Sequence, residues 1–140
     1  MNQKIHQIGD FRQVEQTADA AISPGHLVEQ TSTGVKKHAT EGGFAERMFA
    51  QEDALQGKTV DDDYAEDDMV SVCLAQRGTL VLAMLAAGTA YVKGTRLISA
   101  GDGTLKATTG SPSDHVAVCA EAKDLSASGA SAALGLVRVQ

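Results

Sequence analysis

Short hydrophobic runs recur along the chain from about residue 26 onward, and residues that favour turns separate them. Glycine, aspartate, serine and threonine are the separating residues, and they punctuate the chain too often for long helices. This spacing indicates strands that are joined by tight turns and short loops. The pattern predicts strands at residues 26–30, 35–39, 46–51, 69–76, 79–86, 96–99, 104–108, 115–122 and 134–139.

Two of the predicted strands are apolar on both faces. In residues 69–75 one face carries Val70, Val72 and Leu74, and the other carries Met69, Cys73 and Ala75. In residues 79–85 one face carries Leu80, Leu82 and Met84, and the other carries Val81, Ala83 and Leu85. A strand with two apolar faces is typical of a sheet that is covered on both sides. We therefore expect an all-β fold, either a packed sandwich or a small barrel.

The spacing of the glycines favours a body built from hairpins. Gly25 and Gly94 each stand nine residues before a second glycine, with an apolar strand between and a short strand after. In the second of these units, Gly101-Asp102-Gly103 supplies the positive φ angles that a tight turn requires. We expect at most one or two short helices, with one turn or two near residues 52–55. Residues 125–133 are predicted to form a surface loop.

Residues 1–21 differ from the remainder because they are polar and hold only scattered apolar side chains. These side chains recur at a spacing of about three: Ile5, Ile8, Phe11 and Val14. The spacing fits one short helix, but Gly9 interrupts it and an extended arm fits equally well. Such a segment buries little by itself, so it is either frayed or docked on another chain. We therefore predict an extended N-terminal arm, 1–21, and a single β-rich domain, 22–140.

Composition and charge exclude several classes of function. A chain of 140 residues has the size of one domain, and its aromatic share of 4% leaves few platforms for stacking bases or sugars. The net charge is −6 and the longest basic cluster is Lys36-Lys37, so nucleic acid is not an expected partner. The longest apolar run is too short to cross a bilayer, and the N-terminus lacks an apolar signal region. We expect a protein that is made in a cytosol and has no membrane partner.

The densest charge cluster is the acidic run at residues 61–68, which reads DDDYAEDD. Carboxylates at this density can bind a hard cation such as calcium. The run lacks the central glycine and the distal glutamate of an EF-hand loop, and no neighbouring histidine completes an acid–base pair. We therefore predict a solvated loop and expect neither a metal nor another cofactor.

Histidine and cysteine offer no recognisable catalytic spacing. The four histidines are isolated in the sequence: His6, His26, His38 and His115. None has a cysteine or serine nearby in a pattern that signals an activated nucleophile, although partners can converge in space. The two cysteines, Cys73 and Cys119, lie in apolar runs and are expected to be buried thiols. We predict no catalytic residue and no enzyme activity.

An ordered set of glycines and strand residues covers roughly residues 22–139. Its members are GHLV at 25–28, FAQEDALQGKTV at 49–60, Tyr64 with DDMV at 67–70, LAMLAAG at 82–88, VKGTRL at 92–97, SAGDGTL at 99–105 and VAVCAEA at 116–122. Together they resemble phage head-decoration, or capsid-cement, proteins. Glycines and strand residues specify a fold more than an activity. The acidic run departs from the family's pattern, and the resemblance implies no role for it.

The resemblance carries expectations about partners and location. Members of this group form small β-barrel or β-tulip bodies, commonly trimers, over three-fold and quasi-three-fold positions of the shell, and an N-terminal arm often joins neighbouring capsid subunits. It implies that this chain forms a homotrimer, binds the major capsid protein, and lies on the capsid exterior after assembly in the host cytoplasm. The implied capsid-binding residues are those of the arm: Ile5, Ile8, Phe11 and Val14.

Two alternatives stay open. A trimeric tail or fibre head domain would recognise a host surface through exposed aromatic or polar loops, and the scarcity of aromatic residues argues against it. A small metal-dependent hydrolase would use the acidic run and a histidine, but no spacing of ligands indicates one. The function expected from the sequence is therefore that of a structural virion protein, which binds the outer surface of the assembled capsid and stabilises the lattice.

Overall fold

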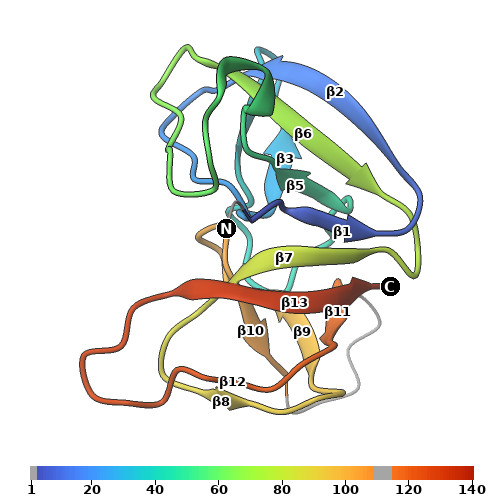
Figure 1. The fold of residues 1–140 in the computed structure, drawn as a ribbon. Helices are drawn as coiled ribbons and strands as arrows, with labels where there is room; N and C mark the ends of the chain where they lie inside the picture. Colours follow the sequence, from blue (N-terminus) through green and yellow to red (C-terminus); the bar gives the residue numbers. More distant parts are fainter. Residues whose placement is uncertain (1–2, 109–114) are drawn as a thin grey trace.

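A small closed barrel forms the lower part of the molecule in Figure 1. Among residues 3–108 and 115–140, which the computed structural model describes, five strands form this barrel. In order around it they are β7 (Leu80–Leu85), β10 (Leu105–Ala107), β9 (Arg96–Ser99), β11 (Ala117–Cys119) and β13 (Ala133–Val139). β13 pairs with β7 and closes the barrel; only the β7–β10 contact in this circuit is parallel. The prediction of an all-β fold with a small barrel is confirmed.

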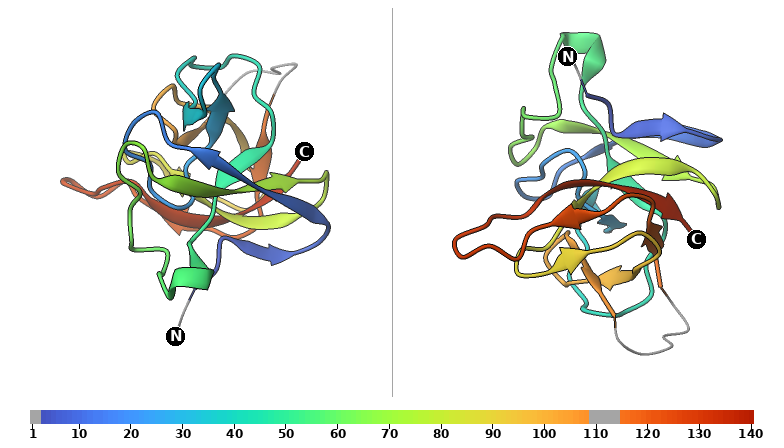
Figure 2. Two further views of the ribbon diagram at one scale, coloured as in Figure 1. Left: turned by 90° about the horizontal axis from the view of Figure 1, so that it is seen from above. Right: turned by 60° about the horizontal axis from the view of Figure 1, so that its bottom comes forward.

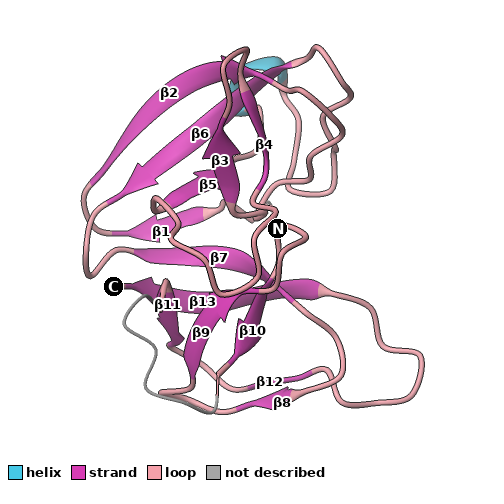
Figure 3. Ribbon diagram, turned by 180° about the vertical axis from the view of Figure 1, so that it is seen from behind, coloured by secondary structure: helices cyan, strands magenta, loops and turns pink. Residues whose placement is uncertain are grey.

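A second layer lies above the barrel in Figures 1 and 3. Its antiparallel sheet consists of β2 (Phe11–Thr17), β6 (Met69–Ala75) and β5 (Met48–Ala50), and the hairpin of β3 (Val28–Gln30) and β4 (Val35–Lys37) packs beside it. The remaining short strands are β1 (His6–Ile8), which pairs with β7, and the pair β8 (Ala90–Tyr91) and β12 (Lys123–Asp124). Figure 2 shows the described segment that leads into β1 beside the 3₁₀ helix η1 (Ala54–Gln56), and the Ile5 N–H donates to Glu52 there.

Two hydrophobic clusters lie on opposite faces of β6. Val70 and Val72 belong to the smaller cluster, between the β2–β6–β5 sheet and the β3–β4 hairpin. Cys73 belongs to the larger cluster, which fills the barrel. The double cover predicted for residues 69–75 is therefore confirmed, because the pleat sends alternate side chains into two different cores. In β7 the burial alternates instead: Val81, Ala83 and Leu85 are buried, and the side chains between them are only half-buried.

The predicted hairpins and the short helix are present. β3 and β4 form the first hairpin, and the antiparallel pair β9–β10 forms the second. The turn between β9 and β10 has φ values of +89° at Gly101 and +87° at Gly103, which confirms the need for glycine there. η1 is a single 3₁₀ turn, and Gly57 follows it with φ +72° as the C-cap. No described helix is long enough to cross a membrane.

The N-terminal segment is folded into the body, which corrects the prediction of a separate arm at residues 1–21. Residues 1 and 2 lie outside the described part of the chain. β1 pairs with β7, and β2 pairs with β6 along its whole length, from Phe11 opposite Ala75 to Thr17 opposite Met69. Ile5 is fully buried in the barrel core. The segment is extended, as expected, but it forms two strands of this chain's own sheets.

The sequence did not predict β2 because residues 11–17 are mostly polar. β2 lies at the edge of its sheet, so it has hydrogen bonds on one side only and both of its faces are partly solvated. Charged side chains such as Arg12 and Glu15 are tolerated there and discourage pairing with another chain. An edge strand therefore needs little apolar character, and its pairing with β6 depends on tertiary contact.

The buried position of Ile5 gives a direct test of this correction. We expect Ile5→Ala to lower the free energy of unfolding by about 2–5 kcal/mol, because it leaves a cavity in the barrel core. Ile8→Ala is the matched control, since the Ile8 side chain is 66% exposed and its loss should change stability by less than about 0.5 kcal/mol. Urea unfolding followed by circular dichroism measures both variants. Equal stability of Ile5→Ala and the wild type would restore the idea of a detached arm.

Candidate functional site

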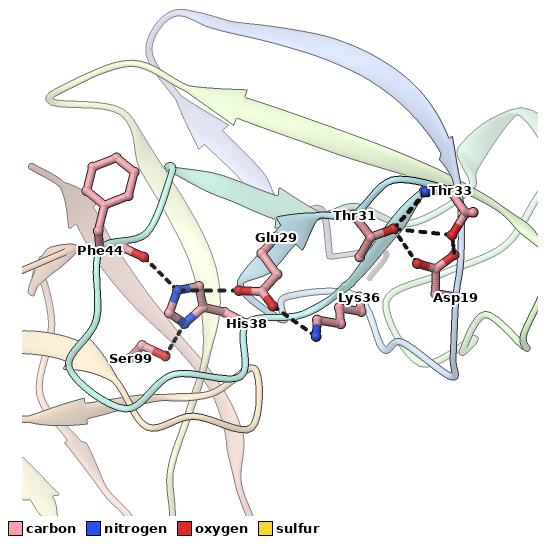
Figure 4. A network of polar contacts seen from close by, with 9 residues as sticks. Asp19, Glu29, Thr31, Thr33, Lys36, His38, Phe44 and Ser99 are labelled. Carbon is pink, nitrogen blue, oxygen red and sulfur yellow. Dashed lines mark hydrogen bonds and ion pairs between the residues drawn. The ribbon is translucent and has the colours of Figure 1, made fainter.

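A buried histidine with hydroxyl and carboxylate neighbours is the polar cluster that most resembles a reactive site (Figure 4). His38 follows β4 and is 2% exposed. Its Nδ1 lies 2.7 Å from Oγ of Ser99 on β9, and its Nε2 lies 2.8 Å from the backbone oxygen of Phe44. Glu29 of β3 places Oε2 3.8 Å from Nε2 and is also paired with Lys36 at 3.3 Å.

The hydrogen bonds assign the protons in this cluster. A carbonyl oxygen only accepts, so Nε2 of His38 donates to Phe44. The Ser99 hydroxyl accepts from the N–H of Gly101 and donates its own proton to Nδ1. Both ring nitrogens therefore have a hydrogen-bond partner, and 3.8 Å to Glu29 is too long for a further hydrogen bond.

These bonds make the cluster structural. In a Ser–His–Asp triad the carboxylate orients the ring through one nitrogen and the hydroxyl stands at the other, open to substrate. Here both ring nitrogens are already used, and Ser99 is fully buried. The cluster instead joins the segment after β4 to barrel strand β9.

A second polar cluster fixes the β3–β4 turn. The side chain of Asp19 accepts hydrogen bonds from the hydroxyls of Thr31 and Thr33 (Figure 4). The Thr31 oxygen in turn accepts from the backbone N–H groups of Thr33 and Gly34. A Cβ atom at residue 34 would stand 2.0 Å from the Thr17 backbone oxygen, so glycine is required there. The turn is therefore packed directly against the end of β2.

His26 is a second buried histidine, and its environment keeps it neutral. Its Nδ1 accepts a hydrogen bond from the backbone N–H of Ser23 at 3.0 Å. Burial, assisted by the positive charge of Lys37, lowers the pKa of His26 from 6.5 to about 4, although Asp102 and Asp63 act in the opposite direction. Protonation would also remove the acceptor that Ser23 uses.

The acidic run at residues 61–68 is exposed apart from one anchor. Tyr64 is buried in the smaller core, pairs with Ile22 through backbone hydrogen bonds, and donates its hydroxyl to the Gln51 backbone oxygen at 2.5 Å. On either side of it, Asp62 accepts from the N–H of Thr59 and Asp68 accepts from the N–H of Ala65. The prediction of a solvated loop is confirmed, and no described cluster of three potential ligands could hold a metal ion.

The prediction that both cysteines are buried thiols is confirmed. Cys73 and Cys119 are both buried free thiols in the larger core. Burial raises the pKa of Cys73 to about 12 and also raises that of Cys119. Both side chains therefore stay protonated near neutral pH and act as small hydrophobic groups.

The four candidate capsid-binding residues are placed very differently. Ile5 is buried, and Phe11 and Val14 are half-buried against the two cores. Only Ile8 is largely exposed. Beside them an open hollow of about 340 Å³ lies between β2 and η1, with the charged side chains Lys4, Glu15, Glu52 and Asp53 among its lining residues. The folded chain therefore exposes Ile8, and not Ile5, on its surface.

Comparison of the fold with solved structures finds a similar protein from a phage particle. It is the N base of the head fiber gp8.5 of bacteriophage phi29. The two folds align with a TM-score of 0.60 over 94% of this chain and 95% of that chain, at 16% sequence identity. Comparison of the sequence with protein-family profiles and with curated proteins gives no match. At this identity the likeness establishes the fold, which is shared from end to end.

Neutral His26 makes stability depend on pH. Below pH 6.5 the unfolded chain binds a proton at His26, which the folded chain does not bind until about pH 4. The neutral His26 ring therefore makes its full contribution to the free energy of unfolding above pH 6.5. This contribution is lost as the pH falls to about 4, and it amounts to on the order of 2 kcal/mol after allowance for partial solvation.

We expect His26→Asn to flatten this dependence, because the Asn oxygen can accept from Ser23 but does not titrate. Unfolding free energies between pH 7 and pH 4 measure the effect, with His6→Asn as the control outside the cores. An unchanged slope in His26→Asn would show that another group is responsible.

Proposed function

We propose that this chain is a structural protein of a phage head, carried on the capsid exterior. The observation that carries the proposal is the end-to-end fold similarity to the base of a head fiber. The stretches that resemble head-decoration proteins support the same particle and the same location. The two arguments are independent, because one uses the backbone path and the other uses the order of glycines and strand residues.

The bonding of the buried polar groups supports an adhesive role. The buried polar groups His38, Ser99 and Tyr64 are used in bonds that join layers of the fold. A capsid-bound subunit works by adding interface that only the assembled shell offers, so the shell is stabilised by mass action. Many weak contacts, repeated by symmetry, achieve this without a reactive pocket.

More specifically, we propose that the chain is a cement subunit. It would form a homotrimer, bind the major capsid protein at three-fold and quasi-three-fold sites, and assemble onto the shell in the host cytoplasm. Of the four candidate capsid-binding residues, Ile8 is the one that such a contact would use, because it is exposed on β1.

The base of a head fiber is the second candidate function. The description of the similar structure favours it, because that domain is the N base of a fiber on a phage head. In that role the chain would attach a longer element to the head at selected positions of the shell. We therefore expect the two candidates to differ in copy number.

The copy number of this chain in purified virions tests both candidates. Quantitative mass spectrometry against the major capsid protein measures it, and negative-stain microscopy of particles labelled with an antibody to this chain gives the location. A ratio near one chain per capsid subunit is expected for cement. A small fraction of that ratio, with label at discrete head positions, would assign the fiber base, and absence from virions would overturn the proposal.

A further inference from the structure

One row of residues crosses the outer surface of the barrel in continuous register. Its members are directly opposite neighbours on five adjacent strands: Arg96 of β9, Val118 of β11, Arg138 of β13, Leu80 of β7 and Ile8 of β1. Directly opposite residues point to the same face of a sheet. On the four barrel strands a neighbour of each row member is buried in the core: Leu97, Ala117, Val137 and Val81. On β1 the register shifts between His6 and Ile8, and Gln7 is exposed as well as Ile8. We call this set the arginine row.

The arginine row combines exposed charge with exposed apolar surface. Arg96 and Arg138 are exposed, two strands and roughly 10 Å apart. Ile8 is 66% exposed, and Val118 and Leu80 are half-buried. Neither arginine forms an ion pair with any residue that the structure describes. Arginine beside apolar side chains is the composition of an interface centre.

Two further arginines extend this positive end of the molecule. Arg12 and Arg77 line one shallow hollow at the β6–β7 turn, with Asp10 as the acidic residue among them. Gly78 of the same turn donates its N–H to the oxygen of Val139, the residue after Arg138. The sequence separates these arginines widely, and only the fold brings them to one end.

The acidic run at residues 61–68 lies at the other end of β6. β6 begins at Met69, directly after the run, and its far end leads into the turn that carries Arg77 (Figure 1). The carboxylate side chains of the run are exposed, and none forms an ion pair within residues 3–108 and 115–140. Met69 beside it is 54% exposed. The run is thus complementary to the arginine row both in charge and in apolar content.

We propose that the acidic run of one copy of this chain binds the arginine row of a second copy. This inference rests on the proposed virion function, of which self-association is a part. The contact joins two different patches, so it is heterologous, and heterologous contacts are the kind from which three-fold rings are built. A single exposed ion pair contributes at most about 1 kcal/mol, so the contact requires several charges together with the apolar side chains.

A charge-exchange experiment tests the contact with the full-length chain. The row variant carries Arg96→Glu and Arg138→Glu, and the run variant carries Asp61→Lys and Asp63→Lys, two side chains that accept no hydrogen bond from a described residue. The control variant, Lys4→Glu with Lys123→Glu, makes the same change in net charge as the row variant but lies outside both patches. Sedimentation velocity at low and high ionic strength measures association, and thermal unfolding verifies that each variant is folded.

The expected results are specific to a heterologous contact. The wild type and the control should associate at low ionic strength, with an association constant at least about tenfold lower at high ionic strength. Each patch variant alone should lose at least about tenfold in association. An equimolar mixture of the two variants should recover association as heterodimers, because the intact acidic run of the row variant can bind the intact arginine row of the run variant. A closed ring of three is not expected in the mixture, since it would join two like variants at one contact.

Other outcomes would overturn the inference. A wild type that stays monomeric, or a mixture that does not recover association, would exclude this self-contact. Binding of the same variants to purified capsids separates the two proposals. If the row variant loses capsid binding while the wild type is monomeric, the row belongs to the capsid contact and the virion function stands. If no form of the chain binds capsids but the exchange succeeds, the self-contact stands and the virion function fails.

Discussion

Pairing between β7 and β13 closes the barrel, and β7 also pairs with β1 and β10. The ladder runs without interruption from Ala133 opposite Leu85 to Arg138 opposite Leu80. On its other edge, β7 donates backbone N–H groups from Leu82 to Ile5 and from Met84 to Gly25, at 2.8 and 2.9 Å. β1 and β10 complete the same edge. A strand bonded on both edges thus holds the beginning, the middle and the end of the chain, which makes the contacts of the fold predominantly non-local.

The second layer depends on β6 and on a few buried polar bonds. β6 separates two hydrophobic clusters, so its two faces cannot exchange without exposing valines or burying polar groups. The His38–Ser99 hydrogen bond joins the segment after β4 to the barrel, and Thr79 donates its hydroxyl to the Asp10 backbone oxygen at 2.6 Å. Because unpaired polar groups are costly in a core, these bonds fix how the layers meet. These interior polar bonds therefore hold the two layers of the fold together.

The distribution of charge over the surface supports the adhesive role that we propose. Its arginines gather at one end, its acidic run lies at the other, and apolar side chains such as Ile8 and Met69 are exposed beside them. Such a distribution orients an approaching partner and gives contacts that depend on ionic strength. The similarity to a head-fiber base is a similarity of scaffold, and the virion role that we propose requires these surfaces as well as the fold.

The sequence alone determined those features whose cause is local. Glycines at positive φ marked the β9–β10 turn, two apolar faces marked β6 as a strand between two cores, and apolar surroundings identified both cysteines as buried thiols. The density of carboxylates likewise identified an exposed loop. Each of these follows from a residue and its immediate neighbours.

Only the tertiary structure decided the features that depend on distant partners. β2 is a polar edge strand whose pairing comes from β6, about 60 residues away in the chain. Ile5 was predicted to be an anchor for another chain, but it is buried in the barrel core of its own chain. The arginine row requires five strands in one register, and the His38 cluster requires β9. Sheet pairing joins residues that are remote in sequence, so side chains that share a face of the barrel share no local signal that would predict it.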